Sequence, residues 1–245
     1  MGGPRDEDSG GVTRVRAVLF DAAGTLLSVH PSVGHVYADE ARKFGVALSP
    51  HDLDRHFHLA WTRHRPQTGH GTPFHTSEAH ERAWWRELVW DAFTAAGAPY
   101  DFMAGFDTFF DGLYERFAAP HDWHVFDDVM PALESLRNAG ARLAVVSNWD
   151  SRLPRLLKGL GLSSWFDLVI TSAEAGVSKP HPDIFHIALD NLGLDTAQAV
   201  HVGDSEEEDI AGAHAAGLRA VRIDRDNATT GALHSLLELP AHLGL

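Results

Sequence analysis

The chain has no cysteine, little lysine and no long apolar run. The lack of cysteine excludes disulfides and thiolate chemistry. The only lysines are Lys43, Lys158 and Lys179, and the net charge is −14 with histidine neutral. Because nucleic-acid phosphates need a basic surface, we expect no nucleic-acid partner. No run approaches the roughly 20 apolar residues that span a bilayer, and the polar N-terminus does not resemble a secretion signal. We therefore expect no membrane partner and a cytoplasmic location.

Strand and helix patterns divide the chain into a core and an insertion. Short apolar runs typical of buried strands occur at 15–20, 142–147, 166–171, 199–204 and 218–223. Single helical patterns separate the later runs, which predicts an α/β fold with a Rossmann-like, doubly wound parallel sheet. The insertion follows the first strand and shows helical spacing at 33–44, 53–64, 78–95 and 103–117.

This pattern predicts three parts: a disordered tail at 1–13, a core at 14–27 and 124–245, and an all-helical cap at 28–123. We expect hinges at 27–31 and 120–124, so that the cap can close over the core. The cap's tryptophans are expected to form its own hydrophobic core. They are Trp61, Trp84, Trp85 and Trp90.

Polar residues follow the carboxyl ends of four successive predicted strands. In an open α/β sheet these ends meet in the crevice that binds ligands. The residues, in strand order, are Asp21 and Thr25, Ser147 and Asn148, Lys179, and Asp204 with Asp209. Taken singly, each has a structural alternative, such as a turn for Asp21 or a helix cap for Asp204. Four signals in order indicate one active site.

These residue types suit magnesium-dependent phosphoryl transfer. A carboxylate such as Asp21 can attack phosphorus and form a covalent aspartyl phosphate. Mg²⁺ prefers oxygen ligands, which Asp21, Asp204 and the backbone carbonyl of Ala23 could supply. Lys179 and Ser147 could bind the transferring phosphate. Three further residues have expected supporting roles: Thr25 and Asn148 in phosphate binding, and Asp209 beside the metal.

The same residues resemble the four signature motifs of the haloacid dehalogenase (HAD) superfamily. Residues 21–25 match the first motif, 147–148 the second, 179–180 the third and 203–209 the fourth. The inserted helices resemble the type 1 cap of subclass I, and residues 31–37 and 147–150 look most like one group within that subclass. The resemblance implies a hydrolase with Asp21 as nucleophile, Ser147 and Lys179 on the phosphate, and Mg²⁺ on Asp204. It also implies a small phosphorylated metabolite as substrate.

One position departs from the family pattern. Phosphatases of the family carry a second aspartate, which acts as general acid and base, where this chain has Ala23. Because such catalysis typically contributes 10²–10⁴-fold, we expect weak activity unless the leaving group is good or another group substitutes. Cap histidines are candidates, since histidine titrates near neutrality. They are His30, His35, His56, His58 and His64.

Three alternatives follow from the missing aspartate. The chain could be an attenuated member that binds a phosphorylated metabolite or a protein. It could be a 2-haloacid dehalogenase, although such enzymes usually carry tyrosines where Ala23 and Phe185 stand. It could also resemble phosphonoacetaldehyde hydrolase, which has an alanine at this position and uses a cap lysine. Lys43 is the cap's lysine here.

Overall fold

The core of the fold is a five-stranded parallel sheet with the order β5-β4-β1-β6-β7. The computed structural model describes residues 14–65, 74–226 and 228–245, so the predicted tail at 1–13 lies outside the described residues. The sheet strands, in chain order, are β1 (Ala17–Phe20), β4 (Arg142–Ser147), β5 (Leu168–Thr171), β6 (Ala199–Gly203) and β7 (Arg219–Arg222). The predicted parallel α/β fold is confirmed.

The central strand, β1, is buried on both faces. Its Phe20 pairs in register with Val145 of β4 on one side and with Val202 of β6 on the other. Alternate side chains point to opposite faces of a strand. Phe20 therefore packs in one hydrophobic layer and Leu19 in the other. This explains the unbroken apolar run in the sequence, which is typical of a strand covered by helices on both sides.

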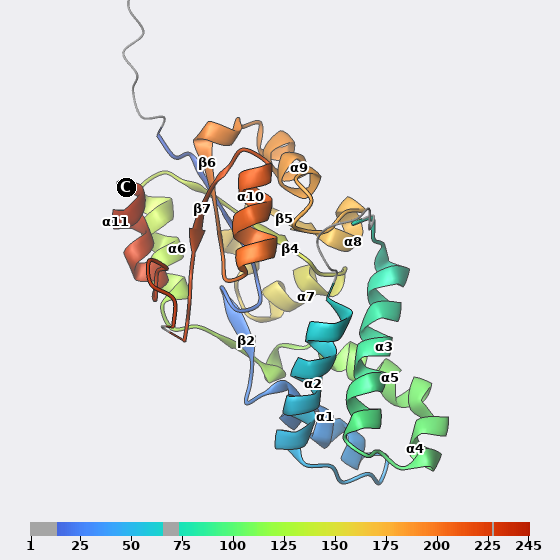
Figure 1. The fold of residues 1–245 in the computed structure, drawn as a ribbon. Coiled ribbons are helices and arrows are strands. Elements are labelled where there is room, and N and C mark those ends of the chain that lie inside the picture. Colours follow the sequence, from blue (N-terminus) through green and yellow to red (C-terminus); the bar gives the residue numbers. More distant parts are fainter. Residues whose placement is uncertain (1–13, 66–73, 227) are drawn as a thin grey trace, which may run out of the picture.

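Two layers of helices cover the sheet (Figure 1). One face packs against α6 (Val129–Asn138), α7 (Arg152–Gly159) and α11 (Leu239–Leu243). The other packs against α9 (Asp183–Leu192) and α10 (Gly212–Ala215). A short helix, α8 (Ser172–Ala175), follows β5 directly. Among the described residues, no helix is long and apolar enough to cross a membrane.

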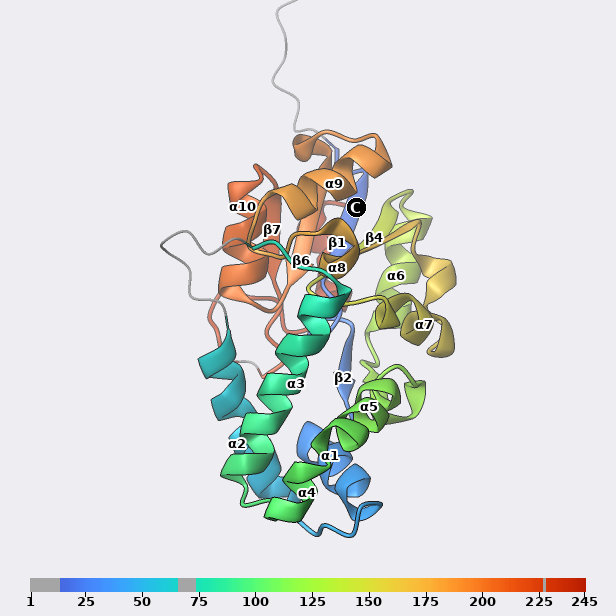
Figure 2. The ribbon, with the colours of Figure 1, turned by 90° about the vertical axis from the view of Figure 1, so that its right-hand side faces the viewer.

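The inserted segment forms a group of helices beyond the carboxyl ends of the strands (Figure 2). They are α1 (Val33–Arg42), α2 (Pro50–His64), α3 (Glu78–Ala95), α4 (Tyr100–Ala104) and α5 (Phe106–Arg116). A separate aromatic-rich cluster holds them together, and Phe93 and Phe109 lie at its centre with ring centroids 4.8 Å apart. The last predicted helix is divided in two at Gly105, which is the C-cap of α4 and the N-cap of α5.

The two segments that connect the core to the insertion pair with each other. β2 (Leu27–Val29) and β3 (Trp123–Val125) form an antiparallel ladder in which Ser28 lies opposite His124. The helical patterns of the sequence did not predict this ladder. It overlaps both predicted hinges, so the two crossing segments are tied together rather than independent. The division into core and cap remains a proposal.

Candidate active site

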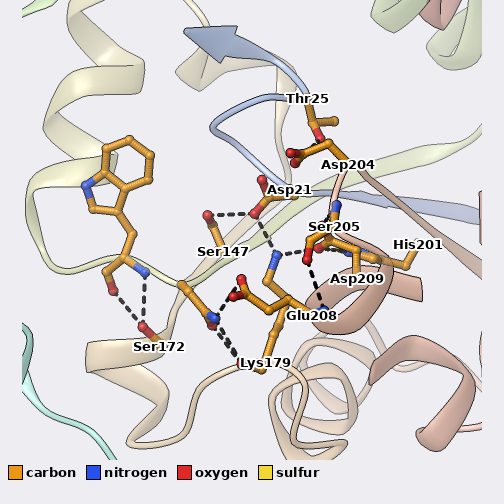
Figure 3. Close-up of polar contacts among 12 residues, drawn as sticks. Asp21, Thr25, Ser147, Ser172, Lys179, His201, Asp204, Ser205, Glu208 and Asp209 are labelled. Carbon is orange, nitrogen blue, oxygen red and sulfur yellow. Dashed lines mark hydrogen bonds and ion pairs between the residues drawn. The ribbon is translucent and has the colours of Figure 1, made fainter. Parts of the chain in front are cut away.

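The candidate site lies where the carboxyl ends of β1, β4 and β6 and the loop after α8 meet (Figure 3). Asp21 directly follows β1, and its Oδ1 accepts hydrogen bonds from Ser147 Oγ at 2.8 Å and Lys179 Nζ at 2.6 Å. Ser147 is the last residue of β4, and Lys179 is carried by the loop before α9. Ser147 and Lys179, which lie 126 and 158 positions after Asp21 in the sequence, thus donate to the same carboxylate oxygen.

A buried ion-pair network holds Lys179 in place. Its ammonium donates to Asp21 and also to Asp209 Oδ1 at 2.5 Å, and the lysine is only 2% exposed. Burial alone would lower the pKa of Lys179, but the attraction of Asp209 and Asp21 outweighs it and raises that pKa. Burial would likewise raise the pKa of Asp209, yet Lys179 and His201 hold it well below its usual range. The lysine is therefore a fixed positive charge.

Three carboxylates converge beside this lysine. Oxygen atoms of Asp21, Asp204 and Asp209 all lie within 4.8 Å of one another. Burial and the nearby charges of Asp21 and Asp209 raise the pKa of Asp204 to about 7. Burial also raises the pKa of Asp21, against the opposing effect of Lys179. Such crowding of negative charge disfavours ionisation unless a cation lies between the carboxylates.

The oxygen donors at this point fit Mg²⁺, which prefers hard oxygen ligands. Both oxygens of Asp209 are already engaged, Oδ1 by Lys179 and His201 and Oδ2 by the Ser205 N–H. Asp21 Oδ2 and Asp204 Oδ2 accept no hydrogen bond within the described part of the chain. The available ligands are therefore Asp21 and Asp204, with Asp209 as the residue that positions Lys179.

Two glycines allow the carboxylates to approach so closely. Gly24 has φ +82° and a Cβ there would lie 2.6 Å from Asp204 Oδ2. Gly203 ends β6, and a Cβ there would lie 2.1 Å from Asp209 Cγ. Asp209 lies in a π-helical turn, η4 (Glu206–Ala211), rather than in the regular helix that the sequence predicted. Turns of this kind are frequent at functional sites.

Thr25 and Asn148 lie at the site with their side chains already engaged. Thr25 is fully buried and its hydroxyl donates to Asp204 Oδ1 at 3.4 Å. The Asn148 amide donates to the Lys179 carbonyl and to Glu208, and its oxygen accepts from the Lys179 N–H at 2.7 Å. Asn148 thus holds the loop that carries Lys179, and contact of either residue with phosphate stays a prediction.

Above the carboxylates lies a cavity of about 930 Å³ between the sheet and the inserted helices. Ala23 lines it and brings no titratable group. Of the five candidate histidines, His58 lines the cavity. The others lie elsewhere: for example, His64 pairs with Asp91 at 2.9 Å and His35 with Ser32 at 2.8 Å.

Two other sequence interpretations can be compared with this cavity. Lys43, the candidate for a Schiff base, is exposed and pairs with Glu40 at 2.6 Å, and it does not line the cavity. Trp61 and Trp85 contact the rings of their neighbours, as expected for a hydrophobic core, but they also line the cavity. The prediction that the four tryptophans pack in the cap's own core is confirmed, and two of them face the cavity in addition.

Two residues that contact the site, Arg65 and His201, were not among the predicted ones. Arg65, which follows α2, reaches the core and donates to Ser205 Oγ at 2.7 Å and to Glu208 Oε1 at 3.1 Å. His201 is a polar residue within the apolar run of β6, and that exception in the pattern could have indicated its bond to Asp209 at 2.8 Å. Nothing in the pattern around Arg65 indicates its position.

Comparisons with known proteins identify the family. The profile of the haloacid dehalogenase-like hydrolases matches residues 15–217. Haloacid dehalogenase-like hydrolase domain-containing protein 3 of Danio rerio is 36% identical over 240 residues, which cover 94% of this chain and 96% of that protein. The group that residues 31–37 and 147–150 resemble is this one, and that prediction is confirmed.

Other similar proteins differ in the reaction their names give. A ribulose-1,5-bisphosphate 5-phosphatase of Halopiger xanaduensis is 31% identical, covering 85% of this chain and 84% of that protein. An (S)-2-haloacid dehalogenase of Burkholderia cepacia is also 31% identical, covering 87% of this chain and 85% of that protein. The crystal structure of a HAD phosphatase from Thermococcus onnurineus has a TM-score of 0.65 and 29% identity, covering 94% of this chain and 98% of that one. The chain belongs to the haloacid dehalogenase-like hydrolase family.

Proposed function

We propose that this hydrolase is a magnesium-dependent phosphatase that acts on a small phosphorylated metabolite through an aspartyl phosphate on Asp21. The observation that carries the proposal is the arrangement of Asp21. One oxygen is fixed by Ser147 and Lys179, whereas the other accepts no hydrogen bond from a described residue, and the carboxylate lies beside Asp204. A carboxylate held in one orientation at the base of a cavity is positioned to attack a bound substrate.

The residues support two balanced steps. The free oxygen of Asp21 attacks phosphorus, the bond from phosphorus to the ester oxygen breaks, and the leaving group departs with the bonding electron pair as an alkoxide or phenoxide, which takes a proton from solvent. Water then attacks phosphorus in the aspartyl phosphate and loses one proton to solvent. The bond from phosphorus to the Asp21 oxygen breaks, its electron pair restores the carboxylate, and inorganic phosphate is released. Lys179 and Ser147 stabilise the negative charge of the phosphoryl oxygens. Mg²⁺ on Asp21, Asp204 and the Ala23 carbonyl would supply a positive charge for the same oxygens.

The proposal is tested by measuring phosphate release from para-nitrophenyl phosphate and a set of metabolite phosphates, with Mg²⁺ and with a chelator. We expect Mg²⁺-dependent release that Asp21→Asn abolishes. The matched control is Asp190→Asn, an exposed position on α9 where the same change leaves activity intact. Release that survives Asp21→Asn would disprove the covalent mechanism. Halide release from 2-chloropropionate without phosphate release would instead establish a dehalogenase.

The alanine at 23 makes a second measurement informative. Without a general acid at this position, the alcohol must leave unprotonated, so activity should fall steeply as the pKa of the alcohol rises. Ala23→Asp should restore proton transfer and raise the hydrolysis of alkyl phosphates by about 10²-fold or more. The dependence on leaving-group pKa should then become shallower. An unchanged dependence would mean that another group already acts as the acid.

A further inference from the structure

The cavity wall opposite Asp21 is mainly aromatic. It is built by α1, α2, α3 and α5 of the insertion and by Trp149 of the core. Among the rings that line it are Phe57, Trp61, Trp85, Phe110, Phe117 and Trp149. A volume of about 930 Å³ would hold a ligand of drug-like size. The base of the cavity is polar, whereas the wall offers apolar surface and ring faces.

The charges that line this cavity are already balanced or negative. Three arginines line it, and each is paired with a carboxylate: Arg65 with Glu208 at 3.1 Å, Arg152 with Asp150 at 2.7 Å, and Arg222 with Glu206 at 3.2 Å. Within the described part of the chain, the lining therefore has no unpaired arginine or lysine to bind a second phosphate or a carboxylate. A second anionic group on the substrate would be buried without a partner, which is costly.

Within the aromatic wall, a positively charged group would find one ring face already occupied. The Arg152 guanidinium lies in the wall with its Cζ 3.3 Å from the Tyr114 ring centroid, so one ring face near the cavity is already occupied by a cation. The carboxylate in this part of the wall is Asp54, which accepts from Ser32 Oγ at 2.5 Å and from the Gly34 N–H at 2.6 Å. Its charge is therefore already stabilised. The aromatic part of the wall therefore favours a neutral group, whereas the base of the cavity is negatively charged and includes Glu207 in its lining.

Tyr37 presents a polar group to the cavity from a mostly apolar wall. Tyr37 is 1% exposed and packs against Phe57, Phe93 and Phe117. Its hydroxyl makes no hydrogen bond to a described residue, and the side chain lines the cavity. A ligand that fills the cavity can therefore form one hydrogen bond with this hydroxyl while its remaining surface packs against rings.

We propose that the substrate is the phosphate monoester of a neutral, predominantly aromatic or alicyclic alcohol or phenol, whose ring system packs in the aromatic wall. This inference rests on the proposed phosphatase function and adds the class of the leaving group. Sugar phosphates, bisphosphates and phosphorylated carboxylic acids are excluded as preferred substrates, the first because of their many hydroxyls and the others because of their additional negative charge.

The test compares primary alkyl phosphates, so that leaving-group acidity is similar across the set. We would measure kcat/KM for 2-(2-naphthyl)ethyl phosphate, glucose 6-phosphate, glycerol 1-phosphate and phosphocholine. Discrimination by apolar contacts should be at least about tenfold, so the naphthyl ester is expected to lead by that margin. Equal values, or a lead by any of the other three, would overturn the inferred substrate class.

Two adjacent tryptophans of α3 provide a matched pair of variants. Trp85 lines the cavity, whereas Trp84 is not part of its lining and its indole N–H donates to the His64 carbonyl. Trp85→Ala should raise KM for the naphthyl ester about tenfold and leave glycerol 1-phosphate unchanged, because only the larger ligand reaches the wall. Trp84→Ala should change neither value. If both variants have the same effect, the wall does not bind the leaving group.

A binding measurement separates failure of this inference from failure of the proposed function. Calorimetry with 2-naphthylmethylphosphonate, which cannot be hydrolysed as an ester, and with methylphosphonate would be made on the wild-type protein with Mg²⁺. Tighter binding of the naphthyl compound supports the substrate class even if no ester is hydrolysed, in which case the phosphatase proposal alone fails. If hydrolysis depends on Asp21 but shows no preference for naphthyl compounds, the proposed phosphatase function stands and the proposed substrate class is refuted.

Discussion

Replacing Lys179 with methionine tests the electrostatic design of the site most directly. The ammonium is 2% exposed and contacts Asp21 at 2.6 Å and Asp209 at 2.5 Å. Methionine has a similar length but no charge, so Lys179→Met leaves two buried carboxylates without their common partner. Removing one member of a buried ion pair costs about 3–5 kcal/mol. We expect a loss of this size in the free energy of unfolding, together with loss of activity.

The assay is urea unfolding followed by far-ultraviolet circular dichroism, with chelator present so that no metal replaces the missing charge. Lys158→Met is the control, because Lys158 lies exposed in the last turn of α7 and has no ion pair in the described part of the chain. That change should alter stability by less than about 0.5 kcal/mol. Adding Asp209→Asn to Lys179→Met removes one of the unpaired carboxylates and should recover about 0.5–3 kcal/mol.

Two outcomes would refute this reasoning. If Lys179→Met unfolds within about 1 kcal/mol of the wild type, then the carboxylates do not depend on the lysine for their charge. If Asp209→Asn adds its own loss to that of Lys179→Met, then Asp209 contributes through His201 and Ser205 rather than through the lysine. His201 and the Ser205 N–H, which also donate to Asp209, make this second outcome a specific alternative.

Three further predictions concern the metal, the link between insertion and core, and acid stability. Mg²⁺ should raise the thermal unfolding midpoint of the wild type by mass action, and scanning calorimetry should show no such rise for Asp204→Asn. Tyr114→Phe removes a 2.7 Å hydrogen bond to buried Asp150 and should cost about 1.5–3 kcal/mol in urea unfolding, as for bonds to charged groups. Burial would raise the pKa of Asp128, but hydrogen bonds from Arg225 and residues 235–236 hold it below its usual range. Its contribution is therefore present above about pH 4 and lost below, so the stability difference from Asp128→Asn should shrink when unfolding is followed from pH 6 to pH 3.

Much of the base of the site could be predicted from the sequence because Asp21, Ser147 and Asp204 lie at the ends of strands. A parallel strand in this fold is a short apolar run, and the residue after it lies at the ligand-binding edge by geometry alone. Asp21 and Asp204 follow their runs directly, and Ser147 ends its own. The side-chain distances then follow from a sheet in which β1 pairs with both β4 and β6. The proximity of these three residues therefore needed no separate prediction of long-range contacts.

The wall of the cavity could not be predicted in the same way. In a helical insertion, the same spacing of apolar residues describes a side chain that packs in the core and one that faces a cavity. Trp84 and Trp85 are neighbours in sequence, yet only the second lines the cavity. Arg65 reaches Glu208 across 143 residues, a contact that depends on how the insertion lies over the sheet. Local periodicity carries no information about that placement.

The alanine at position 23 and the aromatic wall favour the same class of substrate by independent physical routes. Ala23 provides no proton, so a leaving group that is stable as an anion is favoured, and phenols are far more acidic than sugar hydroxyls. The wall provides ring faces and paired charges, so a neutral aromatic group is favoured there as well. The first argument depends on the bond that breaks and the second on the surface that is buried. Activity with 2-naphthyl phosphate well above that with 2-(2-naphthyl)ethyl phosphate would show the effect of leaving-group acidity. A preference for 2-(2-naphthyl)ethyl phosphate over glucose 6-phosphate would show the effect of the aromatic wall.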